Sequence, residues 1–219
     1  MKTMVSPSLL SANFIDLKSD IEMINKSEAD WLHLDVMDGV FVPNISFGPI
    51  IVSAVRQATT LPVDVHLMIE EPERYVEDFV RAGADRLTVH VEASLHLHRT
   101  LSRIEELGAM PGVSLVPSTP LSAITEVLPM CGQLLVMLVN PGFGGQTMIP
   151  EMLNKTERAR GLIDAVNPDC LLEVDGGVKA ENLGAVLAAG AETIVVGSAI
   201  YNERQSVADS VAQLRQAIG

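Results

Sequence analysis

Short apolar runs rich in Val, Ile and Leu alternate along the chain with longer segments whose apolar residues recur at helical spacing. The runs are too short for helices and are typical of buried strands. They predict eight strands, near Met4–Leu9, Trp31–Val36, Val63–Met68, Arg86–Val91, Gly112–Val116, Leu134–Val139, Leu171–Val174 and Thr193–Val196. The segments between them predict helices over Asp16–Ser27, Gly48–Gln57, Pro72–Ala82, Leu95–Leu107, Leu121–Leu128, Pro150–Val166, Ala180–Ala189 and Ser206–Ile218.

Residues that favour helix ends stand at the borders of these segments. Asp16 or Ser19 is suited to begin the first helix, because a short polar side chain can accept a hydrogen bond from a free backbone N–H. Gly83, Gly108 and Gly190 stand where three helices are expected to end. The borders therefore agree with the apolar pattern.

Eight strand–helix units with near-continuous apolar strands indicate a parallel sheet covered by helices. Eight such units favour the α/β class and a closed (β/α)8 barrel, the TIM barrel, although an open doubly wound sheet remains an alternative from the pattern alone. No Pro- or Ser-rich linker interrupts the chain, so we expect a single domain over residues 1–219.

Composition limits the classes of binding partner and the compartment that we expect for this chain. The 219 residues include 15 Lys and Arg against 28 Asp and Glu, a formal charge of −13, which argues against nucleic acid or an anionic membrane as partner. Two cysteines, Cys131 and Cys170, fit a reduced compartment rather than a disulfide framework. Neither a signal peptide nor an apolar run of about 18 residues is present, so we expect a cytoplasmic protein.

Polar residues gather at the expected carboxyl ends of the strands, where barrels place their functional groups. His33 and Asp35 are two residues apart on one strand and therefore point to the same side. His66 and Asp175 stand at equivalent depths on two other strands. Each residue alone has an ordinary structural explanation, but two imidazoles and two carboxylates at one mouth suit a divalent metal such as Zn²⁺, Mn²⁺ or Fe²⁺.

Glycines form a second cluster in the loops after the last three strands. A glycine lets backbone N–H groups approach a bound anion, and barrels often bind phosphate with these loops. A single such loop would be explained by a tight turn, but three adjacent loops favour a phosphate site. The glycines are Gly142, Gly144, Gly145, Gly176, Gly177 and Gly197, the last of which precedes Ser198.

Two further groups of residues lie near the expected mouth. Met37, Met68 and Met137 fall near strand ends, where they either exclude water from a site or simply fill the core. His90, Glu92, His96 and His98 follow the fourth strand, and we interpret them as surface residues or as residues behind the main site.

The chain resembles the ribulose-phosphate 3-epimerase family along nearly its whole length, and the set of matching stretches is far more specific than any one of them. These stretches are Pro7–Ala12, His33–Gly39, Phe41–Asn44, Asp64–Met68, Asn140–Gln146 and Glu173–Gly177.

The resemblance implies a (β/α)8 barrel of the ribulose-phosphate binding type with one divalent ion, either zinc, manganese, iron or cobalt, with zinc favoured. It places the metal on His33, Asp35, His66 and Asp175 and gives Asp35 and Asp175 a second role as the catalytic acid and base. It also implies a homo-oligomer that acts on a small-molecule ketose phosphate. The implied substrate contacts are Ser8 and His66 to the sugar, and Gly142, Phe143, Gly144, Gly145, Gly176, Gly177, Gly197 and Ser198 to the phosphate.

Two positions depart from the family pattern. Val116 stands where the family usually has Asn, and Leu138 stands where it usually has Ser or Thr. Both changes replace a polar residue near the expected mouth, so they leave the identity of the sugar substrate undecided. The expected reaction interconverts D-ribulose 5-phosphate and D-xylulose 5-phosphate by two-base proton transfer at C3 through an enediolate. D-allulose 6-phosphate is an alternative substrate, and a catalytically silent sugar-phosphate-binding barrel is an alternative function.

A different enzyme on the same kind of barrel is the remaining alternative. Decarboxylases or metal-free isomerases that use a lysine as proton donor need one at a strand end. None of the five lysines falls there, and Lys179 comes closest.

Overall fold

A computed structural model describes residues 2–202 and 205–219 of the chain. Its eight strands are all parallel and form one sheet in the order β1-β8-β7-β6-β5-β4-β3-β2. A single parallel bridge between Ser8 and His33 joins the two edge strands and closes the ring. The strands are β1 (Met4–Pro7), β2 (Leu32–Met37), β3 (Val63–Met68), β4 (Arg86–His90), β5 (Met110–Leu115), β6 (Gln133–Met137), β7 (Leu171–Asp175) and β8 (Thr193–Val196). The predicted TIM barrel is confirmed.

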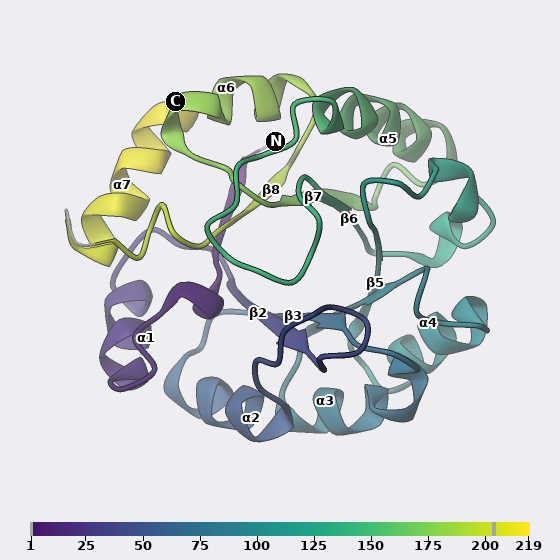
Figure 1. Cartoon of the computed structure of the whole chain (residues 1–219), viewed down its shortest axis with the longest axis horizontal. Coiled ribbons are helices and arrows are strands. Elements are labelled where there is room, and N and C mark those ends of the chain that lie inside the picture. Colours follow the sequence, from purple (N-terminus) through teal and green to yellow (C-terminus); the bar gives the residue numbers. More distant parts are fainter. Residues whose placement is uncertain (1, 203–204) are drawn as a thin grey trace.

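The helices form an outer ring around the strands (Figure 1). Within the described residues the α-helices are α1 (Leu17–Asn25), α2 (Pro49–Ala58), α3 (Val76–Ala82), α4 (Leu97–Glu106), α5 (Met152–Val166), α6 (Ala180–Ala188) and α7 (Val207–Ile218). Short 3-10 turns add η1 (Leu9–Ser11), η2 (Pro72–Arg74), η3 (Leu121–Ala123) and η4 (Leu128–Met130). None of the helices in 2–202 and 205–219 is long and apolar enough to cross a membrane.

The helix predicted over Leu121–Leu128 is wrong. The structure has only the two turns η3 and η4 there. The β-branched residues Ile124, Thr125 and Val127 lower helix propensity, and Pro129 has no N–H with which to extend a helix. One of the eight expected units therefore lacks an α-helix.

The expected helix borders are largely present. Asp16 precedes α1, and its side chain accepts a hydrogen bond from the Ser19 N–H. Gly83 ends α3 with φ +112°, and a Cβ there would lie 2.5 Å from the side chain of Arg56. Glycine is therefore required both by the backbone and by the close approach of α2.

The strands separate two environments. Their outward side chains pack against the helices in one large apolar core that includes Leu34, Val65, Leu87 and Val174. The inward side chains are largely polar, and many of them are buried inside the barrel. Because side chains alternate along a strand, this polar interior follows from every second residue of each strand.

Candidate active site

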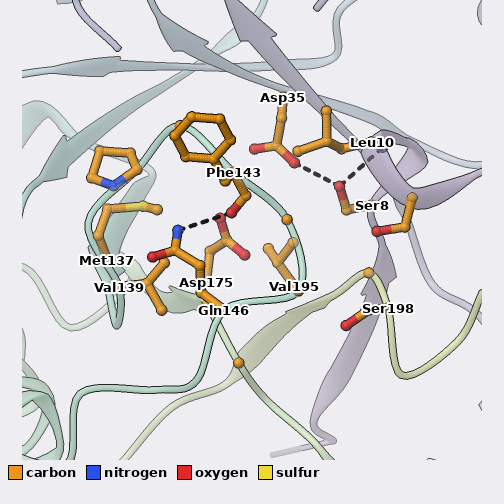
Figure 2. Close-up of a pocket in the computed structure, with 18 of the residues that line it drawn as sticks. Ser8, Leu10, Asp35, Met137, Val139, Phe143, Gln146, Asp175, Val195 and Ser198 are labelled. Carbon is orange, nitrogen blue, oxygen red and sulfur yellow. Dashed lines mark hydrogen bonds between the residues drawn. The ribbon is translucent and has the colours of Figure 1, made fainter. Parts of the chain in front are cut away.

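A pocket opens at the carboxyl ends of the strands, between the loops that follow β1, β6, β7 and β8. Asp35 and Asp175 line it from β2 and β7, and Ser8 lines it from the end of β1. Figure 2 shows the Ser8 hydroxyl donating a hydrogen bond to Asp35 Oδ2, at 2.6 Å. The same Ser8 oxygen accepts a hydrogen bond from the Leu10 N–H, so η1 holds this hydroxyl in place.

Four predicted ligands come together at the base of this pocket, two carboxyl groups in its lining and two histidines buried beneath it. We call His33, Asp35, His66 and Asp175 the mouth cluster. One ligand atom from each lies within 4.8 Å of the other three. Asp35 Oδ1 is 3.2 Å from His33 Nε2 and 3.2 Å from His66 Nδ1. Two imidazole nitrogens and two carboxylates that converge in this way fit a divalent cation.

Burial and neighbouring charge set the protonation of the two carboxyl groups apart. Burial opposes ionisation of Asp35, but contacts with His33 and His66 hold its pKa far below the usual range. Burial and then the charge of Asp35 raise the pKa of Asp175 to about 7. Two carboxyl groups with pKa values pushed apart in one pocket suit an acid and a base.

The two histidines of the mouth cluster also differ. Burial lowers the pKa of His66 to about 4, so its ring is neutral. His33 is equally buried, but the charges of Asp35 and Asp64 outweigh burial and raise its pKa well above the usual value. Without a metal, His33 therefore holds a proton between two carboxylates, which a cation must displace.

Sequence reasoning missed a second group of polar residues one layer deeper in the barrel. Asp64, Gln133 and Glu173, which we call the interior cluster, are all fully buried. The Gln133 amide donates to Asp64 Oδ1 at 3.2 Å and to Glu173 Oε2. His33 Nδ1 lies 2.7 Å from Asp64 Oδ2 and so connects the two clusters. Asp64 and Glu173 each precede a predicted site residue by two positions, a spacing that places them on the same inward side.

His90 is buried, which decides between the two interpretations given for it from the sequence. Its Nε2 lies 2.8 Å from His66 Nε2, and its Nδ1 lies 3.1 Å from Glu92 Oε2. It is thus one of the residues behind the main site. His96 and His98, by contrast, are exposed.

The glycine-rich loops meet around the pocket. The lining includes every residue expected to hold phosphate, namely Gly142, Phe143, Gly144, Gly145, Gly176, Gly177, Gly197 and Ser198. Gly177 has φ +68°, and a Cβ there would lie 2.4 Å from the Met148 nitrogen. The close approach of two backbones therefore depends on this glycine.

Side-chain amides fix the loop after β6. Gln146 donates to the carbonyls of Asn140 and Phe143 at 2.8 and 2.9 Å, the second of which is drawn in Figure 2. Asn44, from the loop after β2, donates to the Gly142 carbonyl at 2.9 Å and ties the two sides of the mouth together. The loop is thereby held over the pocket.

Some expectations at the mouth are changed by the structure. Met37, Met68 and Met137 all line the pocket. Leu138 does not, because it is buried in the outer apolar core. Val116 also lies outside the pocket and makes its contacts through its backbone. The two departures from the family pattern therefore do not alter the pocket wall.

His66 lies below the pocket and is fully buried, so its expected contact with a sugar stays a prediction. Over 2–202 and 205–219, no lysine lines the pocket. The buried Lys155 reaches from α5 to the carbonyls of Val116 and Thr119 instead. A lysine-dependent reaction therefore gains no support here.

Comparison with known proteins identifies the relatives of this chain. The sequence model described as the ribulose-phosphate 3 epimerase family matches residues 4–201. A ribulose-phosphate 3-epimerase of Synechocystis sp. is 54% identical over 96% of this chain and 92% of that protein. The enzyme of the same name from Bacillus subtilis is 51% identical over 91% and 92%. That from Escherichia coli K12 is 45% identical over 91% and 89%.

Solved structures with the same architecture are more distant in sequence. The 3-keto-L-gulonate-6-phosphate decarboxylase of Vibrio cholerae superimposes with a TM-score of 0.75 at 16% identity, over 100% of this chain and 98% of that one. A 3-hexulose-6-phosphate synthase gives 0.69 at 23% identity, over 100% of both chains. At these identities the likeness concerns the barrel alone.

Proposed function

The chain belongs to the ribulose-phosphate 3 epimerase family and is an isomerase, and we propose that it interconverts D-ribulose 5-phosphate and D-xylulose 5-phosphate with a divalent metal ion. One observation carries the proposal. Asp35 and Asp175 come from strands on different sides of the barrel and line one pocket together with the glycine-rich loops. That arrangement suits a substrate with a phosphate at one end and a reacting carbon between two carboxyl groups.

The reaction needs one proton removed from C3 and another returned to the opposite face. In one direction a carboxylate takes the C3 proton, the electron pair of the C–H bond moves toward the ketone oxygen, and an enediolate forms. The second carboxyl group then donates its proton to the other face of C3. The opposed pKa shifts of Asp35, which is ionised, and Asp175, which holds a proton up to about pH 7, support this pairing.

The mouth cluster is the proposed site of the metal, with zinc favoured. A divalent cation there supplies Lewis-acid stabilisation of the negative charge that develops on the substrate oxygens, worth several kcal/mol. The residues themselves orient the reacting groups. His33 and His66 fix Asp35 from two sides, and the Ser8 hydroxyl fixes its second oxygen.

The glycine-rich loops are the proposed phosphate site. The phosphate forms and breaks no bond in the reaction, so its binding serves to hold C3 between the two carboxyl groups. Backbone N–H groups in such loops attract an anion locally, and this outweighs screened surface carboxylates in a chain of charge −13. The three methionines of the pocket would exclude water from the reacting carbon.

We further propose that residues 1–219 act as one barrel domain in the cytoplasm, and as a homo-oligomer. Two observations support this. Cys131 and Cys170 are free and buried, as in reduced proteins. Several large apolar side chains, including Ile45, Ile50 and Leu95, are at least 75% exposed and would gain from an interface.

The two carboxyl groups are tested by isotope exchange in D₂O. Asp35→Asn and Asp175→Asn should each slow epimerisation by at least about a hundredfold. Each variant retains one acid–base group, so each should still exchange the C3 hydrogen of one epimer, and the two variants should exchange opposite epimers. NMR of ribulose 5-phosphate and xylulose 5-phosphate follows both events.

Asp78→Asn, an exposed change on α3, is the matched control and should keep the normal rate. Normal turnover in either site variant would remove that residue from the mechanism. Binding of both sugars by the wild type without deuterium uptake would favour the silent barrel. Uptake with D-allulose 6-phosphate alone would change the assigned sugar.

A further inference from the structure

A hydrogen-bonded series of side chains leads from the mouth cluster to the loop after β5. It begins at His66, whose Nδ1 faces Asp35 while its Nε2 lies 2.8 Å from His90 Nε2. It continues from His90 Nδ1 to Glu92 Oε2 at 3.1 Å. It ends where Glu92 Oε1 accepts a hydrogen bond from the Val116 N–H at 2.9 Å.

The backbone end of the series sets the direction of every hydrogen bond in it. Glu92 Oε1 must accept, because Val116 offers an N–H. Burial disfavours the charged form of Glu92, yet hydrogen bonds from His90, Thr119 and Val116 hold its pKa at about 2. An ionised carboxylate only accepts, so the Nδ1 of His90 must carry the hydrogen.

A neutral imidazole has one N–H, so His90 with its hydrogen on Nδ1 has a lone pair on Nε2. The 2.8 Å contact between the two Nε2 atoms then needs its hydrogen from His66. With Nε2 protonated, His66 presents a lone pair at Nδ1. This lone pair faces Asp35 Oδ1 at 3.2 Å, and a cation between two such acceptors would satisfy both.

We propose that Glu92 and His90 are positioning residues that fix the tautomer of His66, so that its Nδ1 is free to bind the metal. This inference rests on the metal centre proposed above. His33 receives the equivalent support more directly, because its Nδ1 lies 2.7 Å from Asp64. The two histidines thus use opposite nitrogens, and each needs its own partner to select the correct one.

The surroundings bury the histidine end of the series and hold its loop end in place, where the Glu92 side chain is 22% exposed. His90 is fully buried, and the ring of Phe41 packs on it with 4.7 Å between ring centroids. The carbonyl of Val116 accepts a hydrogen bond from Lys155 at 2.8 Å, so α5 holds the loop that orients Glu92. Because Val116 takes part only through its backbone, the side chain at this position is free to vary.

Glu92→Gln is the sharpest change, because it keeps the size of the side chain. An amide has one oxygen, whereas both Val116 and His90 donate to Glu92. If the oxygen serves Val116, the NH₂ group faces His90 Nδ1 and favours the other His90 tautomer, which in turn protonates His66 at Nδ1. If the oxygen serves His90, the Val116 N–H faces the NH₂ group and loses its acceptor. Either arrangement removes one hydrogen bond of the series.

The experiment measures zinc affinity of the full chain by competition with a chromophoric chelator. Glu92→Gln and His90→Leu should each weaken zinc binding by about 10- to 100-fold. His90→Gln keeps an oxygen that can accept from His66 Nε2 and should recover part of the loss. Ser114→Ala is the matched control, because Ser114 pairs in register with His90, is buried, and makes no hydrogen bond through its hydroxyl within the described residues.

A second readout does not depend on metal binding. Long-range ¹H–¹⁵N NMR of the histidine rings should show His66 with hydrogen on Nε2 in the wild type, and with hydrogen on Nδ1 or a mixture in Glu92→Gln.

Zinc affinity unchanged in folded Glu92→Gln and His90→Leu would overturn the proposal while leaving the metal centre intact. An equal loss in Ser114→Ala would also overturn it, since the effect would then be unspecific. A wild type that binds no zinc, manganese, iron or cobalt would refute the proposed metal centre and this inference with it.

Discussion

The mouth cluster and the interior cluster contain similar residues but differ in what their polar atoms meet. In the mouth cluster, nitrogens of His33 and His66 converge on Asp35 Oδ1, and Asp175 adds a second carboxyl group within 4.8 Å. In the interior cluster, the Gln133 amide stands between two carboxyl groups and donates to both. The mouth cluster is held together by a proton on His33 that a cation can displace, whereas the interior cluster has a neutral amide donor, which leaves Glu173 Oε1 without a partner among the described residues.

The same difference decides between two possible metal sites. Ligand atoms of His33, Asp64 and Glu173 also lie within 4.8 Å of one another. The amide hydrogens of Gln133 point at these carboxyl groups, however, and would repel a cation. Nor do Asp64 and Glu173 line the pocket. Proximity of carboxylates is therefore a weaker sign of a metal than converging lone pairs beside an opening.

Removal of the metal should give the largest effect and separate the two clusters. A chelator should slow epimerisation by at least about a thousandfold, since several kcal/mol of charge stabilisation is lost. The fold should persist, because neither the apolar core nor the interior cluster depends on the metal for its contacts. Activity assays with circular dichroism before and after chelation check this, and added zinc should restore the rate. Full activity in a metal-free sample would contradict the proposed Lewis-acid role.

The pH dependence of metal binding should come from the mouth cluster alone. The pKa of Asp175 in the metal-free protein is about 7, so below pH 7 a proton competes with the cation. Zinc affinity should therefore fall as the pH is lowered from 7 to 5, by up to about tenfold per unit for each proton displaced. The raised pKa of His33 should steepen the slope and extend it above pH 7.

Chelator competition across this pH range measures the slope in the wild type and in Asp175→Asn. The variant should show a shallower dependence, because one displaced proton is missing. An affinity that does not change between pH 5 and 7 would mean that neither group titrates on metal binding.

The barrel and the mouth cluster were predictable because both repeat a simple pattern. Eight apolar runs alternate with amphipathic segments, and the residues at the ends of parallel strands must meet at one edge. The helix expected over 121–128 is absent, although its apolar spacing is helical. Spacing alone does not take account of Pro129 and the β-branched residues, which disfavour a helix.

The interior cluster was missed for a different reason. Asp64 and Glu173 stand within strands that are otherwise apolar, but they lie two positions before His66 and Asp175 and must share their inward side. Strand alternation could have found them. The contact between His66 and His90 was not predictable in this way, because it depends on which strands are neighbours and on their register.

Glu173 gives the smallest expected effect and the closest control for Asp175, which lies two residues further along β7. Burial and then the charge of Asp64 raise the pKa of Glu173 well above its usual value and favour its protonated form. Glu173→Gln replaces that proton with an amide and keeps an oxygen for Gln133. Epimerisation should stay within about twofold of normal, and the free energy of unfolding within about 1 kcal/mol.

The stability of this variant relative to the wild type should depend on pH, and the raised pKa of Glu173 sets the direction of that dependence. In the unfolded chain Glu173 loses its proton near pH 4.5, whereas in the folded protein it keeps the proton to a much higher pH. The unfolded state therefore binds fewer protons above pH 4.5, and the contribution of Glu173 to stability falls as the pH rises. Glu173→Gln removes this loss, so the variant should gain on the wild type between pH 5 and pH 8 in urea unfolding. A hundredfold loss of activity in this variant would instead place its carboxyl group in the reaction and erase the distinction between the two clusters.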